Sequence, residues 1–293
     1  MITSTPEQSL IDRAPATAGS DGFLRLEVAV VGGRTRIVDL ECGGPVQVLR
    51  CHYLDAAAPD MAFVMIASPG GGVLQGDRLT LDIRVREGAR LHLGTQSATR
   101  LYRMPDGAAR IEMRFDVERG GYLEHLPDPW VPYADSRVSI ETTLVADPEA
   151  TVLLGEVVAP GRAARGEILQ QRRFESSIVA SRPSGTLLFS DATVLDAGDA
   201  LGDPGMLGSH RAVGSLHAIG PNIEPSVLRS AIAAALTGPS TAYAGASSLP
   251  NDAGAWLRVI SDDTGEASRV VAAGHAAVRA AVVGSPVPES RRP

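Results

Sequence analysis

The segment from Ser68 to Asp77 combines several glycines with a terminal carboxylate, a composition shared by phosphate-binding loops and tight turns. A phosphate-binding loop needs the pattern Gly-x-x-x-x-Gly-Lys-Ser/Thr in front of a helix. Here Asp77 stands where the lysine would be, and the alternating residues of a strand follow. Ser68 also lacks the Gly-x-Ser-x-Gly context of a catalytic serine. The residues therefore predict a tight turn in which Asp77 accepts hydrogen bonds from nearby backbone amides.

Other groups that could catalyse a reaction or bind a metal are sparse. All 27 cationic residues are arginine, which excludes a Schiff-base lysine. Cys42 and Cys51 lack the C-x-x-C spacing of a zinc site, and we expect two partly buried thiols and no disulfide. The six histidines, among them His92, His217 and His275, show neither His-x-His nor His-x-x-x-His spacing. We therefore expect ordinary histidines and no tight metal site.

Composition narrows the class of protein further. The formal net charge of −7 disfavours nonspecific binding to nucleic acid, which needs a basic surface. No segment offers the roughly 20 consecutive apolar residues of a membrane span, and residues 1–20 lack the apolar centre of a signal peptide. We expect a cytoplasmic protein with neither nucleic acid nor membrane as a partner. Residues 1–20 and 286–293 are predicted to be disordered tails around a single domain at 21–285.

The elements that must position these groups are mainly strands, because apolar and polar residues alternate through the first two-thirds of the chain. A unit of alternating strand, Gly or Pro turn and second strand recurs about every 30 residues, which is typical of stacked supersecondary units. A looser fourth copy is expected over 174–189, and residues 24–40 predict a hairpin. In the three clear units, a strand at 79–85 is followed by one at 91–93, a strand at 111–117 by one at 122–126, and a strand at 138–145 by one at 152–154.

The last third of the chain has helical spacing. Ala-rich residues 225–236 predict a helix that stops at Gly238 and Pro239, and a short strand is expected around 256–260. A second helix is expected from about Glu266 to Val283, bracketed by glycines. The predicted fold is mostly β, a stacked or helical β-sheet scaffold of β-solenoid type with two α-helices in the C-terminal third.

Four motifs in the first two-thirds of the chain, and a fifth near the C-terminus, resemble those of a known family. Residues 68–77, Ser-Pro-Gly-Gly-Gly-Val-Leu-Gln-Gly-Asp, are similar to the Pro-Pro-Gly-Gly-x-x-x-Gly-Gly-Asp signature of urease accessory protein D, called H in some organisms. Residues 95–103 resemble its Thr-x-x-Ala-Thr-Lys-x-Tyr-Arg segment. Residues 123–128 resemble its Leu-Glu-Trp-Leu-Pro-Gln stretch, and 161–167 its Gly-Arg-x-x-x-Gly-Glu element. Near the C-terminus, residues 243–247 and 258–263 also resemble family segments. Together the motifs follow the family order, and the resemblance covers roughly residues 23 to 285.

The resemblance implies a non-enzymatic role. Proteins of this family bind apo-urease together with the accessory proteins F and G, the latter a GTPase, and help to deliver nickel to the urease active site. The family fold, a helical arrangement of β-sheets with two helices, agrees with the repeat. Nickel would then be transient cargo, and no tightly bound cofactor is expected. This chain departs from the family pattern at Ser68, Arg100 and His125, and it lacks the closing Pro-Arg-Ile-Trp segment.

Under this resemblance, a nickel path needs ligands that release the ion, which carboxylates and an occasional imidazole do better than thiolates. Glu124 and His125 lie between apolar neighbours on a repeat strand, so one of them should face inward. An inward carboxylate should meet an arginine, for which Arg162 is a candidate, or water. The candidate path residues are Asp77, Glu124, His125, Glu156 and Glu167.

The family motifs also supply candidates for contact with partner proteins. Trp130 and Tyr133 lie among prolines and are expected to be exposed aromatic contacts, with structural packing as an open alternative. The full set is Gly70, Gly71, Gly76, Thr99, Tyr102, Arg103, Pro127, Trp130, Tyr133, Gly161 and Arg162.

Two alternatives to a urease maturation factor remain. The first is a β-solenoid enzyme that uses paired carboxylates on a glycan, although an aromatic content of 4% is low for a sugar-binding cleft. The second is a purely structural scaffold with no role in metal transfer.

Overall fold

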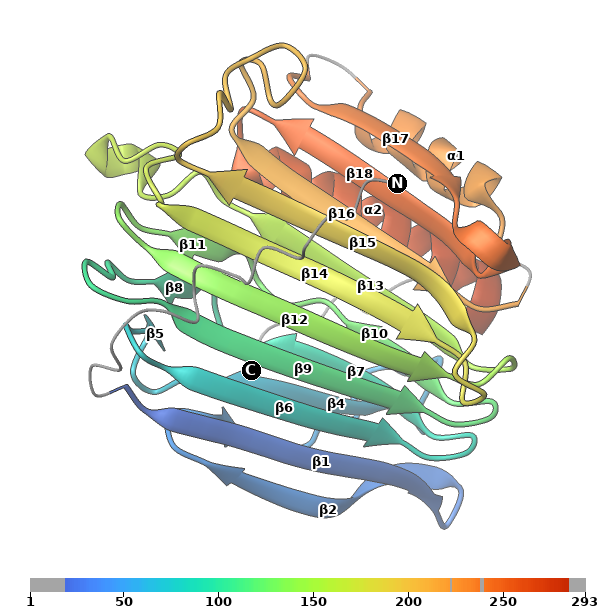
Figure 1. The fold of residues 1–293 in the computed structure, drawn as a ribbon. Coiled ribbons are helices and arrows are strands. Elements are labelled where there is room, and N and C mark those ends of the chain that lie inside the picture. Colours follow the sequence, from blue (N-terminus) through green and yellow to red (C-terminus); the bar gives the residue numbers. More distant parts are fainter. Residues whose placement is uncertain (1–18, 222, 238–239, 285–293) are drawn as a thin grey trace, which may run out of the picture.

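The computed structural model describes residues 19–221, 223–237 and 240–284, and its strands form two large sheets that face each other (Figure 1). Sheet A has the order β15-β14-β12-β9-β6-β1-β2, and the main path of sheet B has the order β17-β18-β16-β13-β10-β7-β4-β3. Sheet A consists of β1 (Asp21–Val31), β2 (Arg34–Gly43), β6 (Arg78–Val85), β9 (Ala109–Val117), β12 (Arg137–Ala146), β14 (Arg173–Ser181) and β15 (Leu187–Asp196). Sheet B contains β3 (Gln47–Val48), β4 (Ala62–Ala67), β7 (Arg90–Thr95), β10 (Tyr122–His125), β13 (Thr151–Val158), β16 (Ala212–Ile219), β17 (Tyr243–Ser248) and β18 (Gly254–Ser261).

The predicted repeat is the framework of both sheets. In each of the three units the alternating strand lies in sheet A, and the strand after the turn lies in sheet B. Equivalent strands pair in parallel, so that Leu79, Ile111 and Ile140 form one row across β6, β9 and β12. The alternating residues bury one face of sheet A against sheet B and leave the other face to solvent. The mostly β, stacked fold class with two helices is confirmed.

The segment 174–189 is a correction to the fourth repeat. β15 does not cross to sheet B but pairs antiparallel with β14 in sheet A. The cause is the turn, because Arg182 N–H donates to the carbonyl of Thr186 and Gly185 adopts a positive φ of 85°. The chain therefore reverses within one sheet, as it does in the predicted hairpin of β1 and β2.

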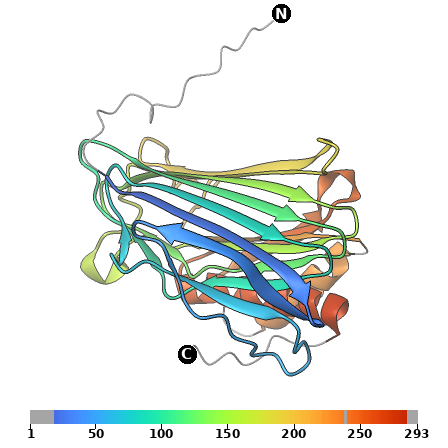
Figure 2. The same cartoon turned by 90° about the horizontal axis from the view of Figure 1, so that it is seen from below.

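Two helices cover the face of sheet B that points away from sheet A (Figure 2). α1 spans Pro225–Ala235 and α2 spans Thr264–Val283, and short 3-10 turns occur at Ala163–Arg165 and Pro250–Asp252. Asp263 caps α2 by accepting a hydrogen bond from the Glu266 amide, so Gly265 lies inside the first turn and not before it. Gly284 ends α2 in the left-handed conformation, as expected.

Sequence patterning did not predict two strands of sheet B, β16 and β17. Every residue of β16 is buried, since sheet A covers one face and α2 the other, so no alternation marks it. β17, at the edge of sheet B, is short and mostly exposed, and after Tyr243 it consists of Ala, Gly and Ser only. The apolar core accordingly has two parts, one between the sheets and one between sheet B and the helices.

Several expectations fall on the chain ends and loops. The predicted tails and the stop at Gly238 and Pro239 lie outside the described residues, except for Gly19 and Ser20. Ser20 is held in place, because its amide donates to Asp77 and its carbonyl accepts from the Arg78 amide. Cys51 is half-buried as expected, whereas Cys42 is exposed on the edge strand β2. None of the described helices combines the length and apolar character needed to cross a membrane.

Candidate functional site

The four motifs meet at one end of the molecule, where three short strands connect the two sheets. These are β5 (Gly72–Val73), β8 (Thr99–Leu101) and β11 (Trp130–Pro132). They pair in parallel, with Gly72 beside Arg100 and Trp130 beside Thr99. Residues that are about 30 positions apart in the chain thus become neighbours because each belongs to one turn of the repeat.

The Gly-rich loop owes its shape to a close backbone approach. A Cβ at Gly72 would lie 2.3 Å from the carbonyl oxygen of Arg100 and 2.9 Å from the ring of Tyr102, so only glycine fits there. Gly70 is exposed, and a Cβ there would meet nothing within 4 Å. Gly72 was not among the predicted motif positions, and nothing in a single sequence distinguishes it from its two glycine neighbours.

Asp77 holds the loop closed, as the turn prediction required. Its side chain is buried, and its two carboxylate oxygens accept hydrogen bonds from the amides of Leu74 at 2.8 Å and Ser20 at 2.9 Å. The carboxylate therefore satisfies amides that would otherwise lack partners. Backbone amides thus occupy one acceptor position on each oxygen of this buried carboxylate.

Arg162 and Glu167 form the ion pair that the Gly-Arg motif suggested. Arg162 Nε donates to Glu167 at 2.8 Å, and the guanidinium lies 4.1 Å from the ring centroid of Tyr133. Glu167 also accepts from the Ala134 amide, and the hydrogen bond from Arg162 lowers the pKa of its carboxyl. Gly161 is needed for this arrangement, since a Cβ would lie 2.7 Å from the carbonyl oxygen of Glu167. These residues fasten the loop end of the repeat.

The predicted aromatic contacts divide between surface and interior. Tyr133 is half-buried between Arg162 and Tyr102, whose ring meets it edge to face with centroids 5.2 Å apart. Arg103 is exposed and pairs with Asp135 at 3.0 Å. Trp130, in contrast, is 8% exposed and packs into the core between the sheets. The expectation that Trp130 is an exposed contact was therefore wrong. The packing alternative is confirmed for this residue.

A row of three hollows begins beside this loop end and runs between the sheets. The outer one, of about 60 Å³, lies between the Gly-rich loop and residues 95–99. It shares Ser68 and Thr99 with a middle hollow of about 80 Å³, which is lined mostly by apolar side chains. The middle hollow shares His125 and Trp130 with an inner hollow of about 60 Å³.

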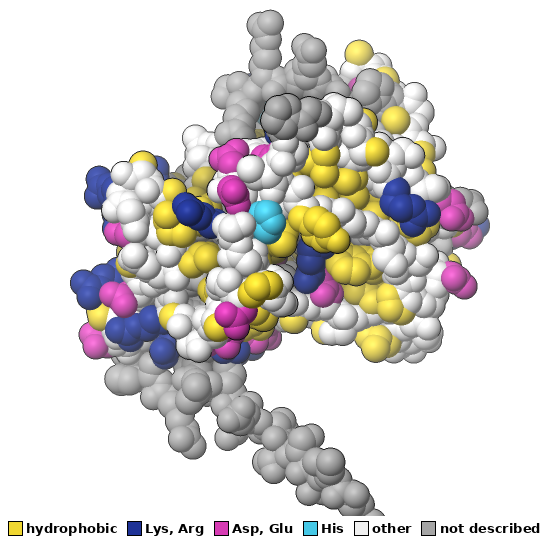
Figure 3. Space-filling view, turned by 90° about the horizontal axis from the view of Figure 1, so that it is seen from above, with side chains coloured by type: hydrophobic (Ala, Val, Ile, Leu, Met, Phe, Trp, Pro, Cys, Tyr) yellow, Lys and Arg dark blue, Asp and Glu magenta, His cyan; other side chains and the backbone are white. Residues whose placement is uncertain are grey.

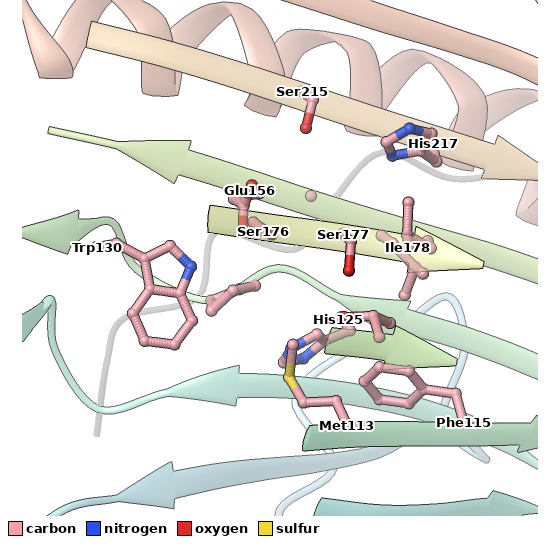
Figure 4. A pocket seen from close by; sticks show the side chains of 14 residues that line it. Met113, Phe115, His125, Trp130, Glu156, Ser176, Ser177, Ile178, Ser215 and His217 are labelled. Carbon is pink, nitrogen blue, oxygen red and sulfur yellow. Dashed lines mark hydrogen bonds between the residues drawn. The ribbon is translucent and has the colours of Figure 1, made fainter. Parts of the chain in front are cut away.

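The inner hollow is the polar one (Figure 4). Glu156 points into it from β13 and accepts a hydrogen bond from Ser176 on β14 at 2.8 Å. Burial raises the pKa of the Glu156 carboxyl against the opposing effect of Ser176. Within the described residues no ion pair reaches Glu156. It is therefore an inward carboxylate without a bonded arginine, unlike Glu167.

His125 lies at the junction of the middle and inner hollows. Its Nδ1 is 3.0 Å from the carbonyl oxygen of Leu93, so Nδ1 carries the proton and donates. Burial lowers its pKa to about 4, which keeps the ring neutral near pH 7. In the neutral ring Nε2 is the basic nitrogen, and the described residues give it no hydrogen-bond partner.

Glu124 points to the opposite side of sheet B from His125, because successive residues of a strand alternate. Both are buried, since α2 covers the face that would otherwise be solvated. The Glu124 carboxylate accepts from Tyr122 at 2.5 Å and from Arg279 Nε at 2.8 Å, and Arg279 also pairs with Asp55. As expected, one of the two residues, His125, faces the space between the sheets, and Glu124 is buried as well, beneath α2.

Two histidines regarded as ordinary belong to this buried cluster. His92 Nδ1 lies 2.7 Å from Glu124, and His275 Nε2 lies 3.4 Å from the same oxygen without a hydrogen bond. Burial alone would raise the pKa of Glu124, but the two imidazoles hold it well below its usual range. No signal in the sequence links residues 92, 124, 275 and 279, because the helix docks on the sheet only in the tertiary structure.

The polar groups are dispersed and not gathered into a metal cage. In the described part of the chain, no three His, Cys, Asp or Glu side chains converge closely enough to hold an ion. The hollows offer single ligands in succession, at His125 and then at Glu156. Such an arrangement suits weak, stepwise contacts with a hydrated cation better than tight binding.

Comparison with known proteins identifies the family. The model of the UreD urease accessory protein family matches residues 20–293. Urease accessory protein UreD 2 of Streptomyces griseus subsp. griseus is 37% identical over 284 residues, which cover 96% of each chain. Urease accessory protein UreD of Haloarcula marismortui is 35% identical over 283 residues, covering 95% of this chain and 93% of that protein. The chain thus belongs to the UreD family of urease accessory proteins.

Proposed function

We propose that this protein is a non-catalytic scaffold for maturation of the urease nickel centre. It binds apo-urease together with an F-type accessory protein and a G-type GTPase in the cytoplasm, and nickel passes through it as cargo. The observation that carries this proposal is the row of hollows between the sheets in a chain of the UreD family.

The path residues in this proposal are those that line the hollows. Glu156 and His125 offer one oxygen and one nitrogen ligand in succession, and the ion keeps most of its water. Asp77, Glu124 and Glu167 act indirectly, because their carboxylates are engaged by amides or arginines. They maintain the loop end and the helix contact that enclose the path.

The loop end is the proposed contact surface for partner proteins. It carries Arg100 and Arg103 at the surface beside the exposed Gly70. These exposed groups lie next to the outer hollow, so a partner docked there would face its opening. Arginines above such a site suit a partner with acidic residues.

The test uses a host in which the gene is deleted and urease is purified. The deletion strain should yield urease with little nickel and little activity, and the wild-type gene should restore both. Glu156→Gln should lower the nickel content of urease while apo-urease still co-purifies with the accessory proteins. Glu141→Gln is the matched control, since Glu141 lies on the outer face of sheet A and pairs with Arg110. Fully nickel-loaded urease from the deletion strain would contradict the proposal.

The alternative of a purely structural scaffold predicts normal nickel content for Glu156→Gln. Alanine at Asp77 or Glu124 would not separate the two functions, because both carboxylates hold the fold together. A glycan-active enzyme is not favoured. The hollows between the sheets are far below the ~300–1,000 Å³ of small-molecule pockets, and the lining of a larger surface hollow, of about 610 Å³, contains no aromatic side chain to hold a sugar.

A further inference from the structure

His217, which sequence patterning placed among ordinary histidines, sits at the far end of the inner hollow in an unusual setting. It lies on β16, and its Nε2 is 3.0 Å from the carboxylate of Asp191 on β15. Its ring stacks on Phe189 with centroids 5.3 Å apart and planes 7° apart. The ring is therefore fixed in position by two residues of the facing sheet.

The carboxylate that bonds His217 also has a second partner. Arg258 donates to the same Asp191 oxygen at 2.6 Å, so the carboxylate already has a cationic partner. Burial would raise the pKa of Asp191, but His217 and Arg258 lower it, so that it accepts a proton donor as a carboxylate. Because Nε2 faces this carboxylate, the tautomer of His217 that fits donates its Nε2 proton to Asp191 and has its lone pair on Nδ1. Within the described residues Nδ1 has no hydrogen-bond partner, so no serine is bonded to it as in a Ser-His-Asp triad.

Glu156 is the neighbour of His217 in the same hollow (Figure 4). It pairs directly with Ser215 across β13 and β16, and His217 lies two residues further on the same face. Diagonal neighbours of this kind have Cβ atoms about 7–8 Å apart, a gap that two side chains can bridge around one ion. The hollow thus presents a carboxylate and an imidazole nitrogen on adjacent strands.

We propose that His217 is a nitrogen ligand for a divalent transition-metal ion at the inner end of the row, opposite Glu156, and that Asp191 is its positioning residue. This inference rests on the proposed passage of nickel. A ligating histidine commonly donates its other ring N–H to a carboxylate, which fixes the tautomer and strengthens the ligand. Two protein ligands leave the remaining coordination positions to water, so the ion is retained only briefly.

The site selects by ligand chemistry. Imidazole suits nickel, copper and zinc, whereas magnesium and calcium prefer oxygen ligands alone.

The site lies where β15 of sheet A comes near β16 and β18 of sheet B. The surface seen from this side carries arginine, acidic and histidine side chains next to a hydrophobic area (Figure 3). An ion held at His217 would be close to leaving the space between the sheets.

The binding test uses purified full-length protein and Ni²⁺ alone. Calorimetric titration should show that His217→Phe weakens Ni²⁺ binding at least tenfold, and that Asp191→Asn weakens it by about tenfold. Phenylalanine retains the stack on Phe189, and thermal unfolding checks that each variant folds. His210→Phe is the matched control, because His210 forms a His–Asp pair with Asp262 but does not line the hollow. Wild-type affinity in His217→Phe, or an equal loss in His210→Phe, would overturn the proposal.

A second measurement leaves the chain unaltered. In wild-type protein with ¹⁵N-labelled histidine, substoichiometric Ni²⁺ should broaden the His217 ring signals before those of His210, and Mg²⁺ should broaden neither. Unchanged His217 signals would refute the site even if urease activation still depends on the protein. If urease activation in cells did not depend on the protein while Ni²⁺ still bound at His217, the result would refute the proposed function and not the site.

Discussion

Replacing Arg279 by methionine is expected to destabilise the protein by about 3–5 kcal/mol. The Arg279 side chain is fully buried and lies on α2, where it pairs with Glu124 of β10 and with Asp55 of the segment between β3 and β4. Methionine fills a similar volume but removes the arginine partner of both buried carboxylates, so that Asp55 loses its ion pair and Glu124 retains only its imidazole neighbours. Burial of one such unpaired charge is costly enough to exceed the loss of the hydrogen bonds themselves.

Thermal unfolding followed by far-ultraviolet circular dichroism measures this effect. At about 2–4 °C per kcal/mol for a chain of this size, the melting temperature should fall by about 6–20 °C. Arg269→Met is the matched control on the same helix. Its side chain is 63% exposed and lies 3.7 Å from Glu266, so the expected cost is only about 0–1 kcal/mol.

A triple variant separates unpaired charge from lost packing. Combining Arg279→Met with Asp55→Asn and Glu124→Gln removes all three charges, and most of the lost stability should return. The reasoning fails if Arg279→Met unfolds within about 1 kcal/mol of wild type. It also fails if the triple variant is as unstable as the single one, because the loss would then arise from packing.

Three further predictions concern pH and backbone space. Three hydroxyl donors lower the pKa of Glu266 to about 2, so its contribution to stability is complete above pH 4.5 and is lost as the pH falls toward 2. In Glu266→Gln the free energy of unfolding, measured with urea, should therefore depend less on pH between 4.5 and 2. Burial lowers the pKa of His125 from 6.5 to about 4, so stability should decline as the pH falls from 6.5 to 4, and His125→Phe should lack this decline. Gly72→Ala should lower the melting temperature because its Cβ would meet the backbone of Arg100, whereas Gly70→Ala should stay within about 0.5 kcal/mol of wild type; equal melting temperatures would contradict the packing argument.

Local patterns predicted much of the fold because their causes are local. Alternation over 79–85, 111–117 and 138–145 reflects strands with one solvated face, and a strand of that kind can be recognised from its own residues. The Ala-rich spacing of α1 and the capping of α2 are equally local. β16 carried no such signal, since both of its faces are buried and its residues need not alternate.

The site was predicted less completely. The motif around Asp77 correctly indicated a turn, because its hydrogen bonds are made to amides of the turn and of the adjacent strand entry. The pairing of Glu167 with Arg162 was foreseeable, because the two residues are five positions apart in one loop. The lack of an arginine at Glu156 was not, because it depends on which strand of the facing sheet lies opposite. The exposure of Trp130 was misjudged for a related reason, as neighbouring prolines do not reveal which sheet lies over the ring.

By itself, the sequence of this protein determined the repeat, the turns, the two helices and the family. These follow from propensities and spacings that act over a few residues, and from motifs that recur in the same order. Only the tertiary structure decided what the polar residues do. It placed Arg279 against Glu124 across 155 positions of sequence, and it set His217 beside Asp191 and Glu156 in one hollow. The partner of a buried charge depends on which layers pack together, and no local pattern encodes that choice.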